Sequence, residues 1–222
     1  MEQRGPQLIL CEDGSHTLFL PELHETYHST RGAIPESIHV YLQNGYVPML
    51  QPGLLRVLEI GYGTGLNALL TAMEAEAKGQ ETFYHSLEPY PLEEEIWSKL
   101  NYGQLLSEEK LWQELNACSW NETHVLTARF QLYKDNVKLE DVNLPASYFD
   151  VVYFDGFAPR KQAELWNVNN LDKLFQSMKS GARLVTYTAK AQLRRDLKQV
   201  GFEAELVKGP PGKKEMILAI RK

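Results

Sequence analysis

The sequence predicts an α/β fold whose mostly parallel sheet ends in an antiparallel hairpin. From residue 54 onward, short apolar runs alternate with amphipathic segments, a pattern typical of a parallel sheet covered by helices. Only a short loop rich in glycine and proline separates the last two apolar runs, which leaves no room for a crossover helix. At 222 residues, the chain is long enough to bury one sizeable core.

The first 50 residues are expected to form short strands and one helix, because glycine and proline interrupt them repeatedly. The helix is expected around Ser37–Leu42. The regular pattern then begins with a buried strand at Leu55–Ile60. Apolar residues recur at helical spacing from Leu66, and Gly79 is placed to end that helix.

The same alternation continues to the end of the chain. Further strands are expected at Thr82–Leu87, Val125–Tyr133, Phe149–Phe154 and Ala182–Tyr187, and helices at Leu92–Leu100, Glu108–Leu115, Leu171–Met178 and Gln192–Gln199. The last two strands, Phe202–Val207 and Met216–Ile220, should pair antiparallel. This is the layout of the Rossmann-like class I methyltransferase sheet. We expect one methyltransferase domain over residues 1–222, with residues 1–50 packed as an extension on a core of residues 51–222.

The composition is that of an ordinary globular protein, with 43% hydrophobic and 23% charged residues. No apolar run approaches the ~18 residues that a membrane span needs, and Met1–Pro6 lacks the apolar core of a signal peptide. Cys11 and Cys118 are far apart and match no metal-binding spacing. We expect a cytoplasmic protein that uses neither a membrane nor a metal.

Charge is distributed unevenly along the chain. Residues 1–150 hold 9 Lys/Arg against 22 Asp/Glu, whereas residues 151–222 hold 14 against 7. A basic third on an acidic protein is either a phosphate-binding face or a solvated surface of uneven charge.

A glycine-rich loop, EIGYGTGLN at residues 59–67, follows the first core strand and opens the next helix. Glycines in that position permit a tight turn and close approach of the backbone to a ligand. Residue 66 is Leu, so the GxGxxG spacing of dinucleotide-binding loops is incomplete. S-adenosylmethionine carries no phosphate and needs an acceptor for its amino group, which Glu59 can supply or position. The residues expected to bind it are Glu59, Gly61, Tyr62, Gly63, Thr64 and Asn67.

Two further strand ends carry polar residues. Glu88, followed by Pro89, ends the strand at 82–87, where a carboxylate can accept hydrogen bonds from the ribose hydroxyls. Asp135 and Asn136 follow the extended segment at 125–133. They either recognise the adenine amino group or form a turn, since Asp-Asn is good turn chemistry.

Asp155 follows the buried strand at 149–154 directly, and the carboxyl ends of strands are where open α/β sheets bind ligands. Phe157 beside it can stack on a flat group. The alternative, an N-capping role for Asp155, is weakened because the next helical pattern starts only near Ala163.

The segment Asp155–Pro159 (DGFAP), followed by Trp166, resembles the DGFAP…W motif of the MnmC-like methyltransferases. Residues 59–67 resemble that family's E-x-G-F-G-T-G-L-N loop, and residues 212–216 (GKKEM) resemble its G-x-K-[RK]-E-M ending. Residues 186–202 resemble its T-[FY]-T-A…G-F run. The resemblance covers nearly the whole chain; Tyr62 replaces the commoner Phe, and Pro210-Pro211 in the last loop depart from the pattern.

This resemblance implies a tRNA methyltransferase that converts the 5-aminomethyl group of the wobble (2-thio)uridine to 5-methylaminomethyl. It also implies that Tyr27, His28 and Glu36, which match the stand-alone members, border the substrate pocket. Only the methyltransferase half of the bifunctional members is expected here. The expected protein partner is therefore a separate flavin oxidase or the enzymes that make the aminomethyl group.

An alkylamine is mostly protonated at pH 7, because its pKa resembles that of lysine at ~10.4. Asp155 is the residue expected to grip the nitrogen and to take its proton, directly or through water. Asp155 and Pro89 are also expected to contact the cofactor, and Phe157 is expected on both the cofactor and the substrate side. The residues expected to contact the RNA phosphates are Arg160, Lys161, Lys190, Lys213 and Lys214.

Residues 24–28 spell HExxH, the zinc-peptidase motif. Pro21, Gly32 and Pro35 leave room for only a short helix, and no third ligand is apparent. We therefore expect no metal site. A methyltransferase for another RNA or for a small-molecule amine remains the alternative function, and a non-catalytic binding module is disfavoured by the acids at 59, 88 and 155.

Overall fold

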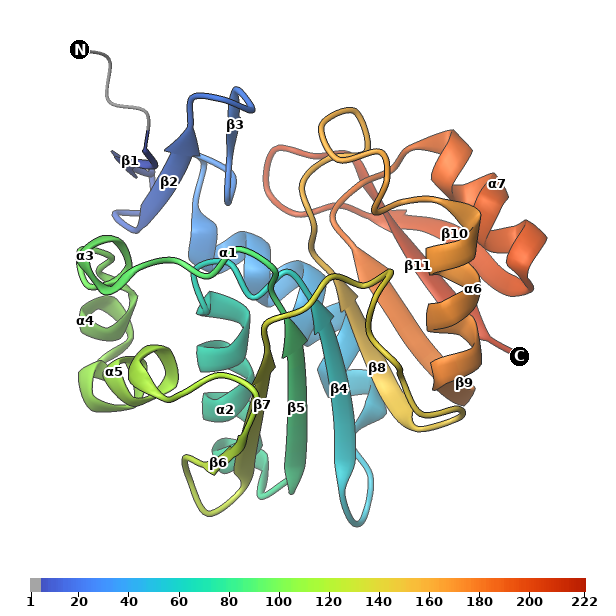
Figure 1. The fold of residues 1–222 in the computed structure, drawn as a ribbon, viewed down its shortest axis with the longest axis horizontal. Coiled ribbons are helices and arrows are strands. Elements are labelled where there is room, and N and C mark those ends of the chain that lie inside the picture. The colour runs from blue at the N-terminus through green and yellow to red at the C-terminus, as the bar shows by residue number, and fades with distance from the viewer. Residues whose placement is uncertain (1–4) are drawn as a thin grey trace.

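The computed structural model describes residues 5–222. The prediction that Met1–Pro6 lacks the apolar core of a signal peptide falls partly on residues 1–4, which lie outside the described residues. The main feature of the fold is an eight-stranded sheet with the order β10-β11-β9-β8-β4-β5-β7-β6 (Figure 1). Its strands are β4 (Leu55–Ile60), β5 (Thr82–Leu87), β6 (Thr123–Val125), β7 (Phe130–Asp135), β8 (Phe149–Phe154), β9 (Met178–Thr186), β10 (Phe202–Lys208) and β11 (Glu215–Arg221).

The strand order places a topological switch point at the middle of the sheet. The chain runs from β4 outward to β5 and β7, and it then returns to β8 on the other side of β4. The pairs β4–β5, β5–β7, β4–β8 and β8–β9 are parallel. Loops that leave the carboxyl ends of β4 and β8 therefore diverge over the crevice where open α/β sheets bind ligands.

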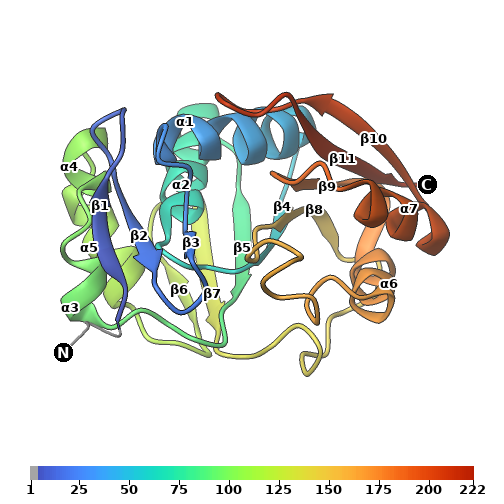
Figure 2. The ribbon, with the colours of Figure 1, turned by 90° about the horizontal axis from the view of Figure 1, so that it is seen from above.

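Helices cover both faces of this sheet, because successive side chains of its central strands point to opposite sides. Val57, Val151 and Tyr153 belong to the core on one face, and Leu58 and Val152 to the core on the other. Figure 2 shows the helical run near α1 along one face and α6 on the other. The helices are α1 (Ala33–Ser37), η1 (Ile38–Tyr46), η2 (Val47–Met49), α2 (Leu66–Lys78), α3 (Glu94–Trp97), α4 (Tyr102–Leu106), α5 (Glu109–Ala117), α6 (Val168–Ser177) and α7 (Ala191–Val200).

The first residues form a separate small antiparallel sheet of β1 (Gln7–Leu10), β2 (His16–Leu20) and β3 (Glu25–Thr26). It lies beyond the carboxyl ends of the main strands (Figure 1). The helix expected at 37–42 is part of a longer run from α1 through the π-helical η1 to η2. The extension therefore reaches the edge of the main sheet at which the ligand crevice opens.

Most core elements agree with the expectation, and the mostly parallel sheet with its antiparallel β10–β11 hairpin is confirmed. Two expected segments are wrong in detail. The segment at 125–133 is the β6–β7 hairpin rather than one strand, because the chain turns back through the Leu126 N–H bond to the Phe130 carbonyl. The helix expected at 92–100 shrinks to α3, and the short helix α4 follows it. Within the described residues, no helix has the length and apolar character to cross a membrane.

Candidate active site

A cavity of about 940 Å³ opens at the switch point, which is a typical size for a small-molecule site. Its walls come from the small N-terminal sheet and from the loops after β4, β5, β7 and β8. The predicted site residues that line it are Tyr27, His28, Glu36, Gly61, Tyr62, Gly63, Thr64, Asn67, Glu88, Pro89, Asp155, Phe157, Arg160, Lys161, Lys190 and Lys213. The predicted residues that do not line it are Glu59, Asp135, Asn136 and Lys214.

The glycine loop after β4 packs directly on the loop after β8. Gly61 has a φ of +93°, and a Cβ at this position would lie 2.9 Å from the carbonyl oxygen of Asp155. Gly65 has a φ of +79°, and a Cβ there would lie 2.8 Å from the hydroxyl of Tyr62. Both positions therefore require glycine for conformation and for space.

Glu88 stands at the end of β5 with both carboxylate oxygens oriented by backbone. Oε2 accepts from the N–H of Gly63 at 3.0 Å, and Oε1 accepts from the N–H of Tyr90 at 2.9 Å. Burial raises the pKa of Glu88 to about 7, and these two hydrogen bonds oppose the rise. Each oxygen keeps a lone pair, so the side chain is fixed as an acceptor beside the glycine loop.

Asp155 is held at both oxygens by side chains from distant parts of the chain. Tyr41, on η1, donates its hydroxyl to Oδ1, and Asn67, on α2, donates from Nδ2 to Oδ2 at 2.8 Å. The same Asn67 nitrogen donates to Oε1 of Glu59 at 3.0 Å, and Ser86 donates to Oε2 of Glu59 at 2.6 Å. The result is a continuous polar chain from the cavity into the core.

The two acids in this hydrogen-bonded chain, Glu59 and Asp155, differ in exposure. Glu59 is fully buried, and burial raises its pKa to about 8. Asp155 faces the cavity, and burial raises its pKa to about 7, although the hydrogen bonds from Tyr41 and Asn67 lower it. Glu59 therefore positions Asn67 from behind, and Asp155 is the acid that a ligand in the cavity can meet.

Two ion pairs cross the cavity from the extension to the rest of the chain. Arg160 donates from Nε to Oε1 of Glu25 at 3.0 Å, and Lys213 donates to Oε1 of Glu36 at 2.7 Å. The rings of Tyr27 and Phe157 meet edge-on with centroids 5.1 Å apart. The extension thus forms one wall of the cavity.

His28 attaches this wall to the glycine loop. Its Nε2 lies 2.8 Å from Oγ1 of Thr64, and burial lowers its pKa to about 4, so the ring is neutral near pH 7. The HExxH segment contains no helix: His24 has a φ of +49°, and Glu25–Thr26 is strand β3. The two histidines therefore do not share a helical face, which the zinc-peptidase motif requires.

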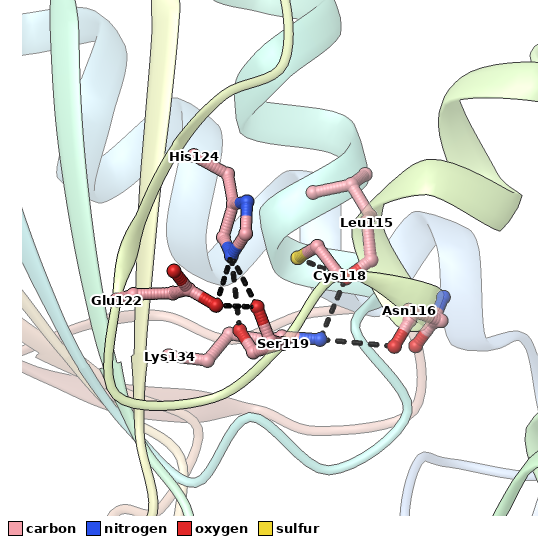
Figure 3. Close-up of polar contacts among 7 residues, drawn as sticks. All are labelled: Leu115, Asn116, Cys118, Ser119, Glu122, His124 and Lys134. Atoms are coloured by element: carbon pink, nitrogen blue, oxygen red, sulfur yellow. Dashed lines mark hydrogen bonds and ion pairs between the residues drawn. The ribbon is translucent and has the colours of Figure 1, made fainter.

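A buried lysine contacts the C-terminal end of α5 (Figure 3). Lys134, on β7 and fully buried, donates to the carbonyls of Leu115 and Asn116 at the end of α5, each at 2.9 Å. The hydroxyl of Tyr62 donates to the same Leu115 carbonyl at 3.1 Å. Through this shared acceptor, the glycine loop is tied to both α5 and β7. Figure 3 also shows the neighbouring contacts among Ser119, Glu122 and His124.

Asp135 and Asn136 contact the end of β5 and do not line the cavity. Asp135 accepts from the Val137 N–H at 3.0 Å through its carbonyl and lies 3.3 Å from His85 through Oδ2. Asn136 donates from Nδ2 to the Glu88 carbonyl at 2.9 Å. The cavity wall at this place is made by residues 137–140 instead. Lys214 borders a small separate hollow beside Tyr187.

Glu25, Tyr41 and Tyr187 are among the cavity residues that sequence reasoning missed. Tyr187 occupies the [FY] position of the T-[FY]-T-A run, and this position was the signal that could have found it. The only signal for Tyr41 was its aromatic character. Glu25 was considered only as part of the HExxH segment.

The cavity residues fit S-adenosylmethionine. Among the described residues, no group donates a hydrogen bond to Oδ1 of Asn67, although this buried atom is an acceptor. An orphaned buried acceptor is costly, and an amino group of a ligand would relieve that cost. The glycine loop and the oriented Glu88 carboxylate supply the remaining features expected for a nucleoside with an amino acid tail.

Residues 106–222 match the model of a family described as S-adenosyl-L-methionine-dependent methyltransferases. The chain belongs to this family. With this match, the enzyme class expected from the sequence is confirmed, and so is the class I methyltransferase fold.

Relatives of this methyltransferase carry the name tRNA 5-methylaminomethyl-2-thiouridine biosynthesis bifunctional protein MnmC. The protein from Cupriavidus necator is 33% identical, over 90% of this chain and 32% of its own length. The protein from Cupriavidus metallidurans is 31% identical, over 95% of this chain and 33% of its own length. The chain thus spans about a third of these relatives.

Two solved structures share the fold of this methyltransferase. MnmC2 from Aquifex aeolicus superposes with a TM-score of 0.80 at 23% identity, covering 100% of this chain and 72% of that one. Spermidine synthase from Thermotoga maritima superposes with a TM-score of 0.52 at 13% identity, covering 100% and 82%.

Proposed function

We propose that this methyltransferase methylates the exocyclic amine of a 5-aminomethyl group on the wobble (2-thio)uridine of tRNA, giving 5-methylaminomethyl. The observation that carries the proposal is the position of Asp155, a half-buried acid whose two oxygens are fixed and which faces a cavity between the cofactor loop and a basic rim. The names of the relatives support the same substrate.

The end of the cavity formed by the glycine loop and Glu88 is proposed to hold S-adenosylmethionine, the methyl donor. Glu88 would accept the ribose hydroxyls, and Asn67 Oδ1 would accept the amino group of the methionine part. The wall at 137–140 would lie against the adenine. The loop residues proposed to contact the cofactor are Gly61, Tyr62, Gly63, Thr64 and Pro89, with Phe157 beside the reacting centre.

The acceptor amine must lose a proton before it can attack. When bound, the cofactor supplies an electrophilic methyl group, which only a neutral amine can accept. Asp155 can hold the incoming ammonium and take its proton, because burial raises the pKa of this carboxyl to about 7 and also disfavours the charged amine. Tyr41 and Asn67 keep the carboxylate in one orientation. The carboxylate would therefore also orient the nitrogen lone pair toward the methyl group.

The rim of the cavity fits an RNA substrate. Lys161, Lys190 and Arg160 line it, and Lys214 is exposed beside it. Cations so placed would contact phosphates, while aromatic walls such as Phe157 and Tyr187 suit an unstacked base. Tyr27, His28, Glu36 and Lys213 complete the proposed substrate side.

We further propose that residues 1–50 and 51–222 act as one methyltransferase domain, since Glu25 and Glu36 of the extension bind Arg160 and Lys213 across the cavity. The proposed substrate assigns the enzyme to the cytoplasm. A separate flavin oxidase or another enzyme would supply the aminomethyl group.

The direct test is methyl transfer from labelled cofactor to tRNA bearing 5-aminomethyl-2-thiouridine. We expect the label in 5-methylaminomethyl-2-thiouridine after nuclease digestion. Comparable efficiency on the free nucleoside or on simple amines would favour a small-molecule enzyme, and no transfer to the modified tRNA would refute the proposed substrate.

A further inference from the structure

Glu36 and Lys213 place an acceptor and a donor side by side in the cavity. Glu36 is 7% exposed, and its oxygens accept from the Ser29 N–H and from Nζ of Lys213, both at 2.7 Å. The side chain of Lys213 is 38% exposed. Each Glu36 oxygen keeps a second lone pair, and the Lys213 ammonium keeps two N–H groups. The pair therefore retains hydrogen-bonding capacity toward a ligand.

This pair lies at the same end of the cavity as Asp155. The charge of Glu36 raises the pKa of Asp155 and the charge of Lys213 lowers it. Tyr187 connects the two places: the ammonium of Lys213 lies 4.3 Å from its ring centre, and its hydroxyl donates to the carbonyl of Gly156 at 3.0 Å. A group held by Asp155 would thus have Glu36, Lys213 and the Tyr187 ring around the rest of it.

The proposed substrate has a fixed arrangement next to its amine. The aminomethyl group is attached to C5 of uracil through one carbon, the acceptor O4 is on the neighbouring ring carbon, and the donor N3–H comes next. When the amine is at Asp155, the O4/N3–H edge must therefore lie within a few ångströms of it. Cytosine reverses this edge, because it has a donor amino group at C4 and an acceptor at N3.

We propose that Lys213 and Glu36 read the O4/N3–H edge of the acceptor uracil, with Lys213 donating to O4 and Glu36 accepting from N3–H. This inference rests on the proposed function. A cytosine in the same place would put its amino group against an ammonium and its N3 lone pair against a carboxylate. The pair would then select uridine over cytidine at the acceptor position, independently of phosphate contacts.

The test compares two anticodon stem-loop RNAs that carry 5-aminomethyluridine or 5-aminomethylcytidine at the same position. We expect wild type to prefer uridine in kcat/KM, and Glu36→Gln and Lys213→Met to reduce this preference by roughly 10- to 100-fold. Glutamine can accept from the uracil N3–H through its amide oxygen or donate to the cytosine N3 through its amide nitrogen, so Glu36→Gln should raise activity on cytidine relative to uridine. Lys78→Met and Glu74→Gln, which break an ion pair on α2 outside the cavity, should keep the wild-type preference.

Calorimetric affinity for S-adenosylmethionine, measured on the same samples, shows whether each variant retains a folded site. A folded Glu36→Gln or Lys213→Met protein whose kcat/KM falls equally for both RNAs would overturn the inference. The pair would then only link the extension to the last loop or contact a phosphate. If Glu36→Gln does not fold, Lys213→Met alone decides between these results. Wild type that methylates neither RNA would refute the proposed function itself, which is a different result from an unchanged preference.

Discussion

Asp155 and Glu59 are joined by the amide of a single residue, Asn67, which gives one N–H to each carboxyl at 2.8 and 3.0 Å. Glu59 is in the core and Asp155 faces the cavity. The orientation of the exposed acid therefore depends on an acid that no ligand can touch. Through this arrangement, a glutamate on β4 positions the cavity acid without lining the cavity.

Replacing Asn67 with alanine should shift the pH dependence of methylation to higher pH. The Asn67 hydrogen bond lowers the pKa of Asp155, so its loss raises that pKa and more alkali is needed to ionise the carboxyl. The measurement is kcat/KM against pH with saturating cofactor. An acidic limb that stays at the wild-type pH in a folded variant would contradict the polar chain described here.

Glu59 should make the ligand-free protein less stable as pH rises. Its folded pKa of about 8 exceeds its ordinary value of 4.5, so the folded state binds the proton more tightly. The contribution of Glu59 to the free energy of unfolding is therefore greatest below about pH 4.5, and it falls as the pH rises toward 8. Each unit of pKa shift corresponds to roughly 1.4 kcal/mol. Glu59→Gln should flatten this slope in urea unfolding between pH 5 and 8. An equally steep slope in the variant would show that Glu59 is ionised in the fold.

Glu88→Ala should weaken S-adenosylmethionine binding by about 1.5–3 kcal/mol, because hydrogen bonds to a charged acceptor are lost. Titration calorimetry on chelator-treated protein measures this and shows at the same time whether binding needs a metal. An unchanged dissociation constant in the variant would remove Glu88 from the ribose. Binding by wild type only after zinc is restored would revive the metal interpretation of residues 24–28.

Exposed lysines at the rim should contribute a salt-dependent part of tRNA affinity. Lys214→Glu and Lys190→Glu should each weaken tRNA binding and reduce the slope of log K against log salt by about one. Cofactor affinity should not change. Lys78→Glu, at the end of α2, is the matched control for the change in net charge. Equal salt slopes in all variants would favour a small-amine substrate.

The sequence was most informative where secondary structure and position in the sheet coincide. Glu88 and Asp155 were predictable because each follows a strand with a clear apolar pattern, and the carboxyl ends of parallel strands meet at one edge. Glu25 and Tyr41 were not, since they reach the site from an extension whose docking on the sheet leaves no periodic signal. The position of Lys134 could not be predicted either, because lysine side chains are almost never fully buried. Its burial depends on the carbonyls of Leu115 and Asn116 at the end of α5.

The central claim is that the Asp155 carboxylate holds and deprotonates the acceptor amine. Asp155→Asn keeps size and hydrogen bonding but removes the charge. Single-turnover methylation of tRNA bearing 5-aminomethyl-2-thiouridine, at saturating cofactor, isolates this step. We predict a rate lower by a factor on the order of 10²–10⁴, with melting temperature and cofactor affinity close to wild type. A near-wild-type rate would contradict the claim and leave orientation by the rest of the cavity as the source of catalysis. Loss of cofactor binding would show instead that Asp155 binds S-adenosylmethionine.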